Sequence, residues 1–219
     1  MPLFPRSFSR IVLAAACATW VPVLGQATPD GTPGVLQCDH IPDHAFEIAA
    51  LGYAEAQAKL GRLLVDGFCG SGHDALAEGI RLLEAASEQG HTDAAILVGA
   101  LLEEGVGGAP DRHRARRHYG RAADAGYRSA QHRLGMLLIT GEGGAQNIEL
   151  GIYWLGAAAG QGDGLAAAAL GVMHARGIHG VNHDVCVALD WFEASVLLDP
   201  ELPVTDLLED LPARLIARC

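Results

Sequence analysis

Residues 130–162, with the sequence AQHRLGMLLITGEGGAQNIELGIYWLGAAAGQG, contain the pattern that decides the fold. A Leu-Gly step at Leu134 and Gly135 is followed six residues later by Gly141, and Gly162 closes an alanine-rich segment. The same three glycine positions recur along the chain at intervals of roughly 36 residues. Self-similarity at such a period is typical of a solenoid of stacked helix pairs. The sequence therefore predicts a repeat protein whose function lies on the surface of the stack.

The spacing of apolar residues predicts where the helices lie in each copy. The Leu-Gly or Val-Gly step occurs at 60–61, 98–99, 134–135 and 170–171. First helices are predicted over about 54–66, 92–104, 128–140 and 164–176, and second helices over about 74–89, 111–125, 147–161 and 185–198. A half-repeat over 43–51 precedes them, and a terminal helix over 205–218 is expected to cover the last open face. The residues expected to cap the second helices are Asp74, Asp111, Asn147 and Asp184.

One apolar stripe on each first helix is expected to form the core, because its members recur at helical spacing around the glycine. The stripe comprises Ala56, Leu60, Leu63 and Leu64, then Ala94, Val98, Leu101 and Leu102, then Ala130, Leu134, Leu137 and Leu138. On the second helices the bulky residues expected to fill the core are Leu82, His118, Trp154 and Trp191. The small residues four positions later are Ala86, Ala122, Ala158 and Ser195. Their register in the repeat places both tryptophans in the core, which disfavours the alternative that they stack on a ligand.

The pattern resembles the Sel1-like repeats, which are relatives of tetratricopeptide repeats. That family reads approximately A-x-x-x-L-G-x-x-Y-x-x-G-x-G and then D-x-x-x-A-x-x-W-x-x-x-A-A-x-x-G. The third copy matches best, the second fits well, and the first and fourth depart in loop length and closing residue. The resemblance covers about 43–199. It implies an all-α, right-handed α-solenoid of four helix pairs with N- and C-terminal capping helices, used to hold other proteins together in signalling, quality control or the bacterial envelope.

The N-terminal segment is typical of a secretory signal peptide, here assigned to residues 1–25. Arg6 and Arg10 precede an apolar run over 11–24, which is too short for a membrane span of about 20 residues. A lipoprotein site at Cys17 is disfavoured because no leucine lies three residues earlier. Residues 26–42 form a leader rich in Pro and Gly. We therefore expect an exported protein, periplasmic or secreted, with no membrane span after signal removal.

The net charge of −11 makes nucleic acid an unlikely partner, since phosphate binding needs a basic surface. Walker, H-E-x-x-H, G-x-S-x-G and S-x-x-K motifs are all missing, so no catalytic residue and no cofactor is predicted. A cysteine-rich envelope enzyme or metal-binding protein stays as the alternative. His174, His179, His183 and Cys186 have spacings that zinc ligands use, and His40 and His44 lie near Cys38. Ordinary loop histidines are the favoured interpretation, because these residues straddle a loop.

Four cysteines follow the signal peptide, and four cysteines allow three connectivities. Each layer of a solenoid touches only its neighbours, so pairing within one end of the array is expected. The prediction is Cys38–Cys69 and Cys186–Cys219, one clamp at each end. The basic segment 112–117 is interpreted as a solvated helix face, with docking of an acidic partner as the alternative.

The stripe beside the core on each first helix is expected to line the concave side, as in the tetratricopeptide relatives, and to bind another protein or peptide. Its residues are Glu55, Arg62, Asp66, Asp93, Ile96, Glu103, Glu104, His132, Met136, Ile139, Thr140, Leu165, Val172 and Arg176. Met136, Ile139, Leu165 and Val172 are expected to form an exposed apolar patch. The hypothesis places an extended or helical peptide there, with its basic portion over Asp66, Glu103 and Glu104. The alternative is that a further helix of this chain covers part of the patch.

Overall fold

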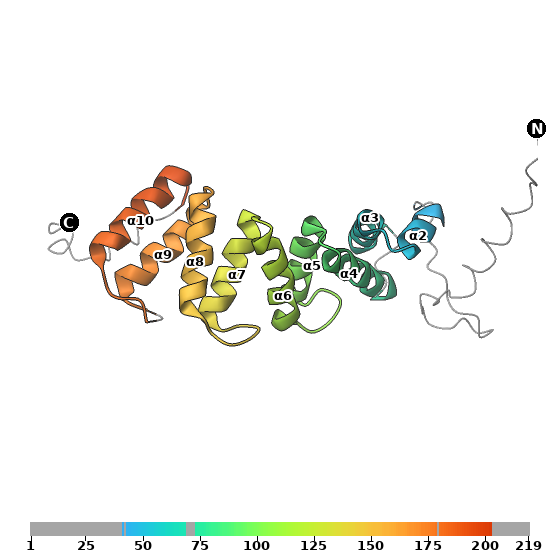
Figure 1. Ribbon diagram of the computed structural model, residues 1–219, viewed down its shortest axis with the longest axis horizontal. Coiled ribbons are helices and arrows are strands. Elements are labelled where there is room, and N and C mark those ends of the chain that lie inside the picture. Colours follow the sequence, from blue (N-terminus) through green and yellow to red (C-terminus); the bar gives the residue numbers. More distant parts are fainter. Residues whose placement is uncertain (1–40, 42, 69–72, 179, 203–219) are drawn as a thin grey trace, which may run out of the picture.

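The computed structural model describes residues 41, 43–68, 73–178 and 180–202, and the regular structure within these ranges is entirely helical (Figure 1). After α2 (Asp43–Ala50), first and second helices alternate along the chain. The first helices are α3 (Ala54–Val65), α5 (Thr92–Glu104), α7 (Arg128–Thr140) and α9 (Gly164–Arg176). The second helices are α4 (His73–Glu88), α6 (Arg112–Asp124), α8 (Ile148–Gly160) and α10 (Val185–Leu198). The predicted all-α repeat fold is confirmed, whereas the expected signal peptide, the terminal helix and all of the leader except Ile41, which is buried, lie outside the described residues.

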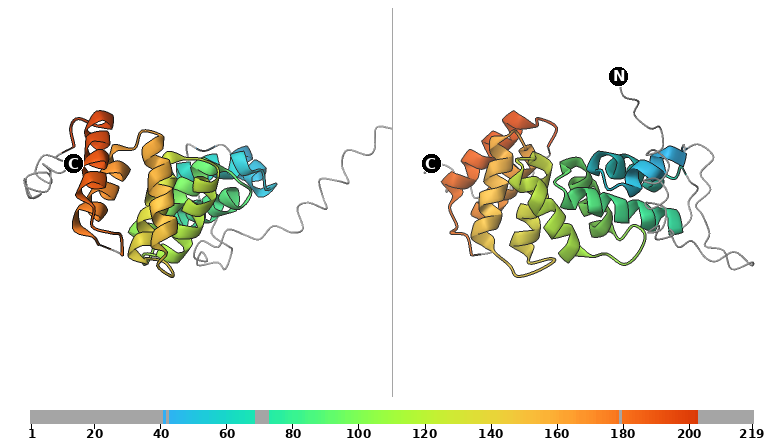
Figure 2. Two further views of the ribbon diagram at one scale, coloured as in Figure 1. Left: turned by 60° about the vertical axis from the view of Figure 1, so that its left-hand side comes forward. Right: turned by 45° about the vertical axis from the view of Figure 1, so that its right-hand side comes forward.

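The helices follow one another in a single row, each packed against its neighbours in the chain (Figures 1 and 2). Each second helix contacts its own first helix, and α4, α6 and α8 also contact the first helix of the next repeat. This arrangement makes stability a sum over neighbouring layers, as expected for a repeat array. The second helices α4 and α6 also touch across a repeat boundary, although this contact is much smaller than those between consecutive helices.

The helix ends show why the repeats have their sequence pattern. Asp111, Asn147 and Asp184 cap the second helices as predicted, and the Asp111 carboxylate accepts a hydrogen bond from the Arg114 amide at 2.9 Å. The prediction for Asp74 is wrong, because α4 already begins at His73. Asp74 lies in the first turn instead, where its negative charge interacts favourably with the helix dipole. The second glycine of each repeat ends α5, α7 and α9 in the left-handed conformation.

The Leu-Gly glycine is the point of closest approach within each repeat. A Cβ atom added at Gly61, Gly99, Gly135 or Gly171 would lie only 2.7–2.9 Å from one side chain of the second helix. The side chains that fill these four sites are Leu83, Tyr119, Leu155 and Phe192, respectively. All four are 2% exposed or less. The glycine therefore creates the socket into which the second helix inserts a buried core residue.

These residues correct the sequence prediction by one position. Leu82, His118, Trp154 and Trp191 directly precede the residues that meet the glycine. Adjacent helix positions point about 100° apart, so the preceding residue lies on a different face. His118 accordingly contacts Ser87 on the second helix of the preceding repeat. Trp154 and Trp191 are partly buried and pack against the core clusters, which agrees with their assignment to the core.

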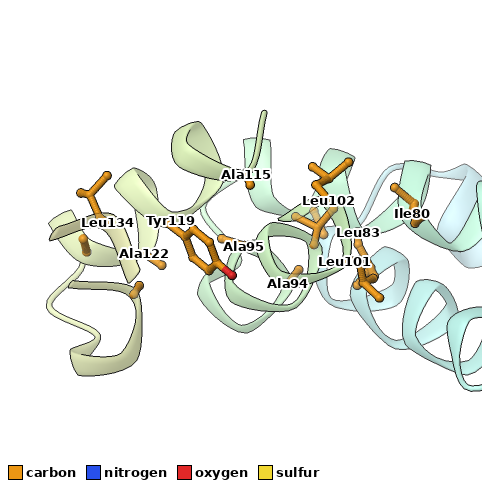
Figure 3. Close-up of a cluster of buried hydrophobic side chains, with 14 of the residues drawn as sticks. Ile80, Leu83, Ala94, Ala95, Leu101, Leu102, Ala115, Tyr119, Ala122 and Leu134 are labelled. Atoms are coloured by element: carbon orange, nitrogen blue, oxygen red, sulfur yellow. The ribbon is translucent and has the colours of Figure 1, made fainter. Parts of the chain in front are cut away.

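The predicted apolar stripe forms the core, which extends along the whole array. Its members are buried except Ala56 and Leu63, which are half-buried at the N-terminal end. The largest cluster joins the first three repeats without interruption. Figure 3 shows part of it, from Ile80 on α4 to Leu134 on α7, with Tyr119 between them. Glycine and alanine are frequent where two helices cross, so the helices approach closely.

Candidate functional site

The first-helix surface is defined here as the predicted binding residues other than Ile139. Glu55, Met136 and Leu165 are exposed on three different first helices. The other exposed members are Arg62, Asp66, Asp93, Glu104, Thr140 and Arg176. The half-buried members are Ile96, Glu103, His132 and Val172. These side chains lie on or directly after α3, α5, α7 and α9, and most of them are exposed, whereas Ile96 and Val172 also pack against the core.

The prediction that Ile139 is exposed is wrong, since its side chain is only 2% exposed. It fills the space left by Gly151 on α8, where an added Cβ would lie 2.5 Å from the Ile139 Cγ1 atom. Val65 occupies the equivalent place against Gly79, where the distance is 3.0 Å. This position therefore faces the partner helix and belongs to the core.

The apolar patch is consequently smaller than expected. Met136 and Leu165 are 37% and 56% exposed, whereas Val172 packs against the Ala188–Phe192 cluster. Leu202, which follows α10, packs against the same cluster and also lies beside Gly164 at the start of α9. The chain itself thus covers the beginning of α9 but leaves Leu165 exposed. Met136 and Leu165 remain as the apolar contacts available to a partner.

Most acidic groups on this surface already have basic partners within the chain. Asp66 lies 3.6 Å from the Arg62 Nε atom. Glu103 accepts a hydrogen bond from the Tyr119 hydroxyl at 2.9 Å and lies 3.9 Å from Arg133. Burial and this hydrogen bond to Glu103 raise the pKa of Tyr119, so the phenol stays protonated. Within the described part of the chain, Glu104 is the one of the three acids expected beneath a basic segment that has no ion-pair partner, and the exposed Asp93 has none either.

Ion pairs and hydrogen bonds also connect successive first helices. The His91 Nε2 atom lies 3.1 Å from the Glu55 carboxylate, while its Nδ1 atom caps α5 by accepting the Ala94 amide. Hydrogen bonds from Lys59 and His91 lower the pKa of Glu55. A similar link joins α7 and α9. The Nδ1 atom of His132 on α7 lies 3.1 Å from the carboxylate of Asp163, the N-cap of α9. These links hold neighbouring first helices in register, so the surface is preorganised.

The basic segment of α6 is engaged with its neighbours. Arg114 binds Glu84 on α4, and Arg117 lies 3.9 Å from Glu88 on the same helix. On the other side, the Arg112 Nε atom lies 2.6 Å from Glu142. Arg116 donates a hydrogen bond to the Ala145 carbonyl at 2.9 Å. These arginines therefore bridge repeats, which leaves little of their charge for an acidic partner.

One group of residues has the composition of a hydrolase triad. The Ser87 hydroxyl lies 2.8 Å from His118 Nδ1, and His118 Nε2 lies 3.4 Å from the Glu84 carboxylate. Ser87 and His118 are both 0% exposed, so no substrate can reach the hydroxyl. An open cleft of about 320 Å³ lies nearby between α4 and the loop before α6, lined by Glu84 and Arg114 but not by Ser87. This arrangement joins two repeats and has no access for catalysis.

The cysteine predictions fall mostly on residues that the structure leaves undescribed. Cys38, Cys69 and Cys219 all lie outside the described residues. Cys186 lies in the first turn of α10 and is disulfide-bonded, so it has no thiolate to offer a metal. His174 and His183 are described, whereas His179 is not. Among the described residues, no group of three or more His, Cys, Asp or Glu side chains is placed to hold a metal ion.

The four helix pairs correspond to four matches of the Sel1 repeat family model, at 54–91, 92–127, 128–163 and 164–199. The chain belongs to the Sel1 repeat family. It is similar to a Sel1 repeat protein from Oxalobacter formigenes, with 28% identity and a TM-score of 0.57 over 71% of this chain and 62% of that one. It is also similar to c5321, a protective antigen of uropathogenic Escherichia coli with the same repeat fold, with 26% identity and a TM-score of 0.61.

The second similarity covers 72% of this chain but only 33% of the E. coli antigen, so the chain spans less than two thirds of either relative. Comparison with curated proteins gave no significant match. Sel1 repeat proteins generally act as scaffolds for protein interactions. Within the described part of this Sel1 repeat chain, none of the helices has the length and apolar character needed to cross a membrane.

Proposed function

We propose that this Sel1 repeat protein is an exported scaffold that binds a partner polypeptide on its first-helix surface. The observation that carries the proposal is the exposure of Met136 and Leu165 on adjacent first helices. The His132–Asp163 pair brings these helices together, with Met136 one turn after His132 and Leu165 two residues after Asp163. A fixed pair of exposed apolar side chains, flanked by satisfied polar groups, provides a contact site for an apolar segment of a partner.

The charge of the surface favours a partner with a basic portion. The chain as a whole carries a net charge of −11. Asp66 and Glu103 interact with Arg62 and Arg133, so the basic portion is now expected to lie over Glu104. Export rests on the signal-like segment 1–25, with the periplasm or the outside of the cell as the destination.

Site-specific photo-crosslinking in envelope fractions tests this function. A photoreactive amino acid at position 136 or 165 is expected to form an adduct with a partner protein. Leu150 on α8 is a matched control, because it is 40% exposed but lies on a second helix. Met136→Glu should reduce the adduct formed from position 165 by about tenfold, since a charge cannot enter an apolar contact without cost. Equal adducts from position 150, or none from 136 and 165 in any cell fraction, would contradict the proposal.

We also propose that the predicted disulfides Cys38–Cys69 and Cys186–Cys219 clamp the two ends of the array. Each closes a loop of about 30 residues, which corresponds to roughly 3–4 kcal/mol in the chain-entropy description. Peptide mapping of the exported protein under non-reducing conditions should recover both linked peptide pairs. A Cys38–Cys219 peptide, or four free thiols, is the result that would exclude the pairing.

A further inference from the structure

The boundary between the first two repeats contains a buried histidine with an incomplete set of hydrogen bonds. His118 on α6 is 0% exposed. Its Nδ1 atom lies 2.8 Å from the hydroxyl of Ser87 on α4, which is also 0% exposed. Its Nε2 atom makes no hydrogen bond, although Glu84 on α4 is only 3.4 Å away. A buried polar atom without a full partner costs stability and requires an explanation.

The other repeats show that this histidine is not required by the fold. Leu82, Trp154 and Trp191 occupy the same position in the remaining repeats. Trp154 packs against the cluster that contains Ala123, the counterpart of Ser87 in the second repeat. The α4–α6 boundary thus has a polar contact, Ser87 to His118, where the α6–α8 boundary has an apolar one.

We propose that His118 is a proton-operated joint that locks the first two repeats when neutral and loosens them when protonated. In the neutral form, Nδ1 accepts the Ser87 hydroxyl and Nε2–H points toward Glu84. Protonation adds a positive charge to a side chain that has no exposure to solvent. The α4–α5 contact is independent of His118, so the first repeat loosens without detaching.

The charged groups around the joint explain why protonation is opposed. Burial is the main cause that lowers the pKa of His118, and Arg117 and Arg121 on its own helix lower it further. Glu84 on α4 acts in the opposite direction, but Arg114 already binds its carboxylate. On the helices that flank α6, Glu103 of α5 is held by the Tyr119 hydroxyl and lies near Arg133 of α7.

The sign of the pH effect follows from proton linkage. An unfolded histidine binds a proton near pH 6.5, whereas folded His118 does so only at lower pH. The opened state therefore gains the proton first as the pH falls. The stability that neutral His118 contributes is present above about pH 6.5 and is lost as the pH falls toward the pKa of the folded state.

Hydrogen exchange measured by mass spectrometry on the full chain tests the joint. Between about pH 7.5 and 5.5, the opening constant of the α4 and α6 amides, corrected for chemical exchange, should rise by up to about tenfold. His118→Leu, which copies Leu82, should abolish this rise. Exchange in α8 serves as an internal reference. His113→Leu is the matched control, because His113 lies exposed on the same helix, and it should leave the rise unchanged.

Two results would overturn the proposal. One is a rise in α4 and α6 exchange that persists in His118→Leu. The other comes from an NMR titration of the wild-type histidines, which does not depend on any variant folding. If His118 titrates at or above the pH of an unfolded histidine, its protonation does not oppose the packed state and the joint does not exist.

Discussion

Replacing Gly171 by alanine is expected to lower the free energy of unfolding by about 1–3 kcal/mol, the usual cost of overpacking a filled core. An added Cβ would lie 2.7 Å from both Cδ1 and Cε1 of Phe192. Phe192 is 1% exposed and belongs to the core of the last repeat, so its ring has little space into which to move. The loss should appear as a lower midpoint in urea unfolding followed by circular dichroism.

Two further variants separate this steric conflict from the ordinary preference of helices for alanine. Phe192→Ala removes all the ring atoms that the new Cβ meets, so the double variant should be more stable than the sum of the two single effects indicates. Gly156→Ala is the control, because Gly156 also lies within a helix but no atom lies within 4 Å of its added Cβ. It should raise stability by up to about 1 kcal/mol. Strict additivity of Gly171→Ala and Phe192→Ala would show that the socket does not form as described.

The periodic part of the fold could be predicted from the sequence because the same constraint repeats four times. The apolar stripes located the helices to within one or two residues, and Asp111, Asn147 and Asp184 gave the starts of three second helices. The start of α4 differs by one residue, because the helix includes His73 before the expected cap Asp74.

Contacts between helices were harder to predict, because a sequence period identifies one face of a helix but not the neighbouring helix that this face contacts. Ile139 was assigned to the surface from its offset alone, although Gly151 on the partner helix gave the missing signal. The assignment of His118 in place of Tyr119 has the same origin, since one position along a helix changes the neighbour from the paired helix to the preceding repeat. The bridges from Arg114 and Arg117 to α4 depend on the rotation between layers, which the repeat period alone does not give.

A glutamine pair recurs in the first and third repeats and could have been recognised from the sequence. Gln131 is 5% exposed, donates a hydrogen bond to the Ala123 carbonyl at 3.3 Å and accepts one from Gln161 at 2.7 Å. Gln57 and Gln89 make the same contact in the first repeat, at 2.7 Å. In the second repeat both positions are alanine, at 95 and 125. The two glutamines therefore occur together or not at all in the first three repeats.

Gln161→Ala alone is expected to cost about 1–3 kcal/mol, because it leaves the buried side-chain oxygen of Gln131 without a donor. Removing both glutamines recreates the alanine pair of the second repeat, and the Ala123 carbonyl keeps its hydrogen bond from the Gly126 amide. The double variant Gln131→Ala/Gln161→Ala should therefore lose less stability than the two single variants combined. Urea unfolding of all four proteins gives the coupling energy directly. A coupling near zero would mean that water replaces the lost donor, and that the paired occurrence of these glutamines has another cause.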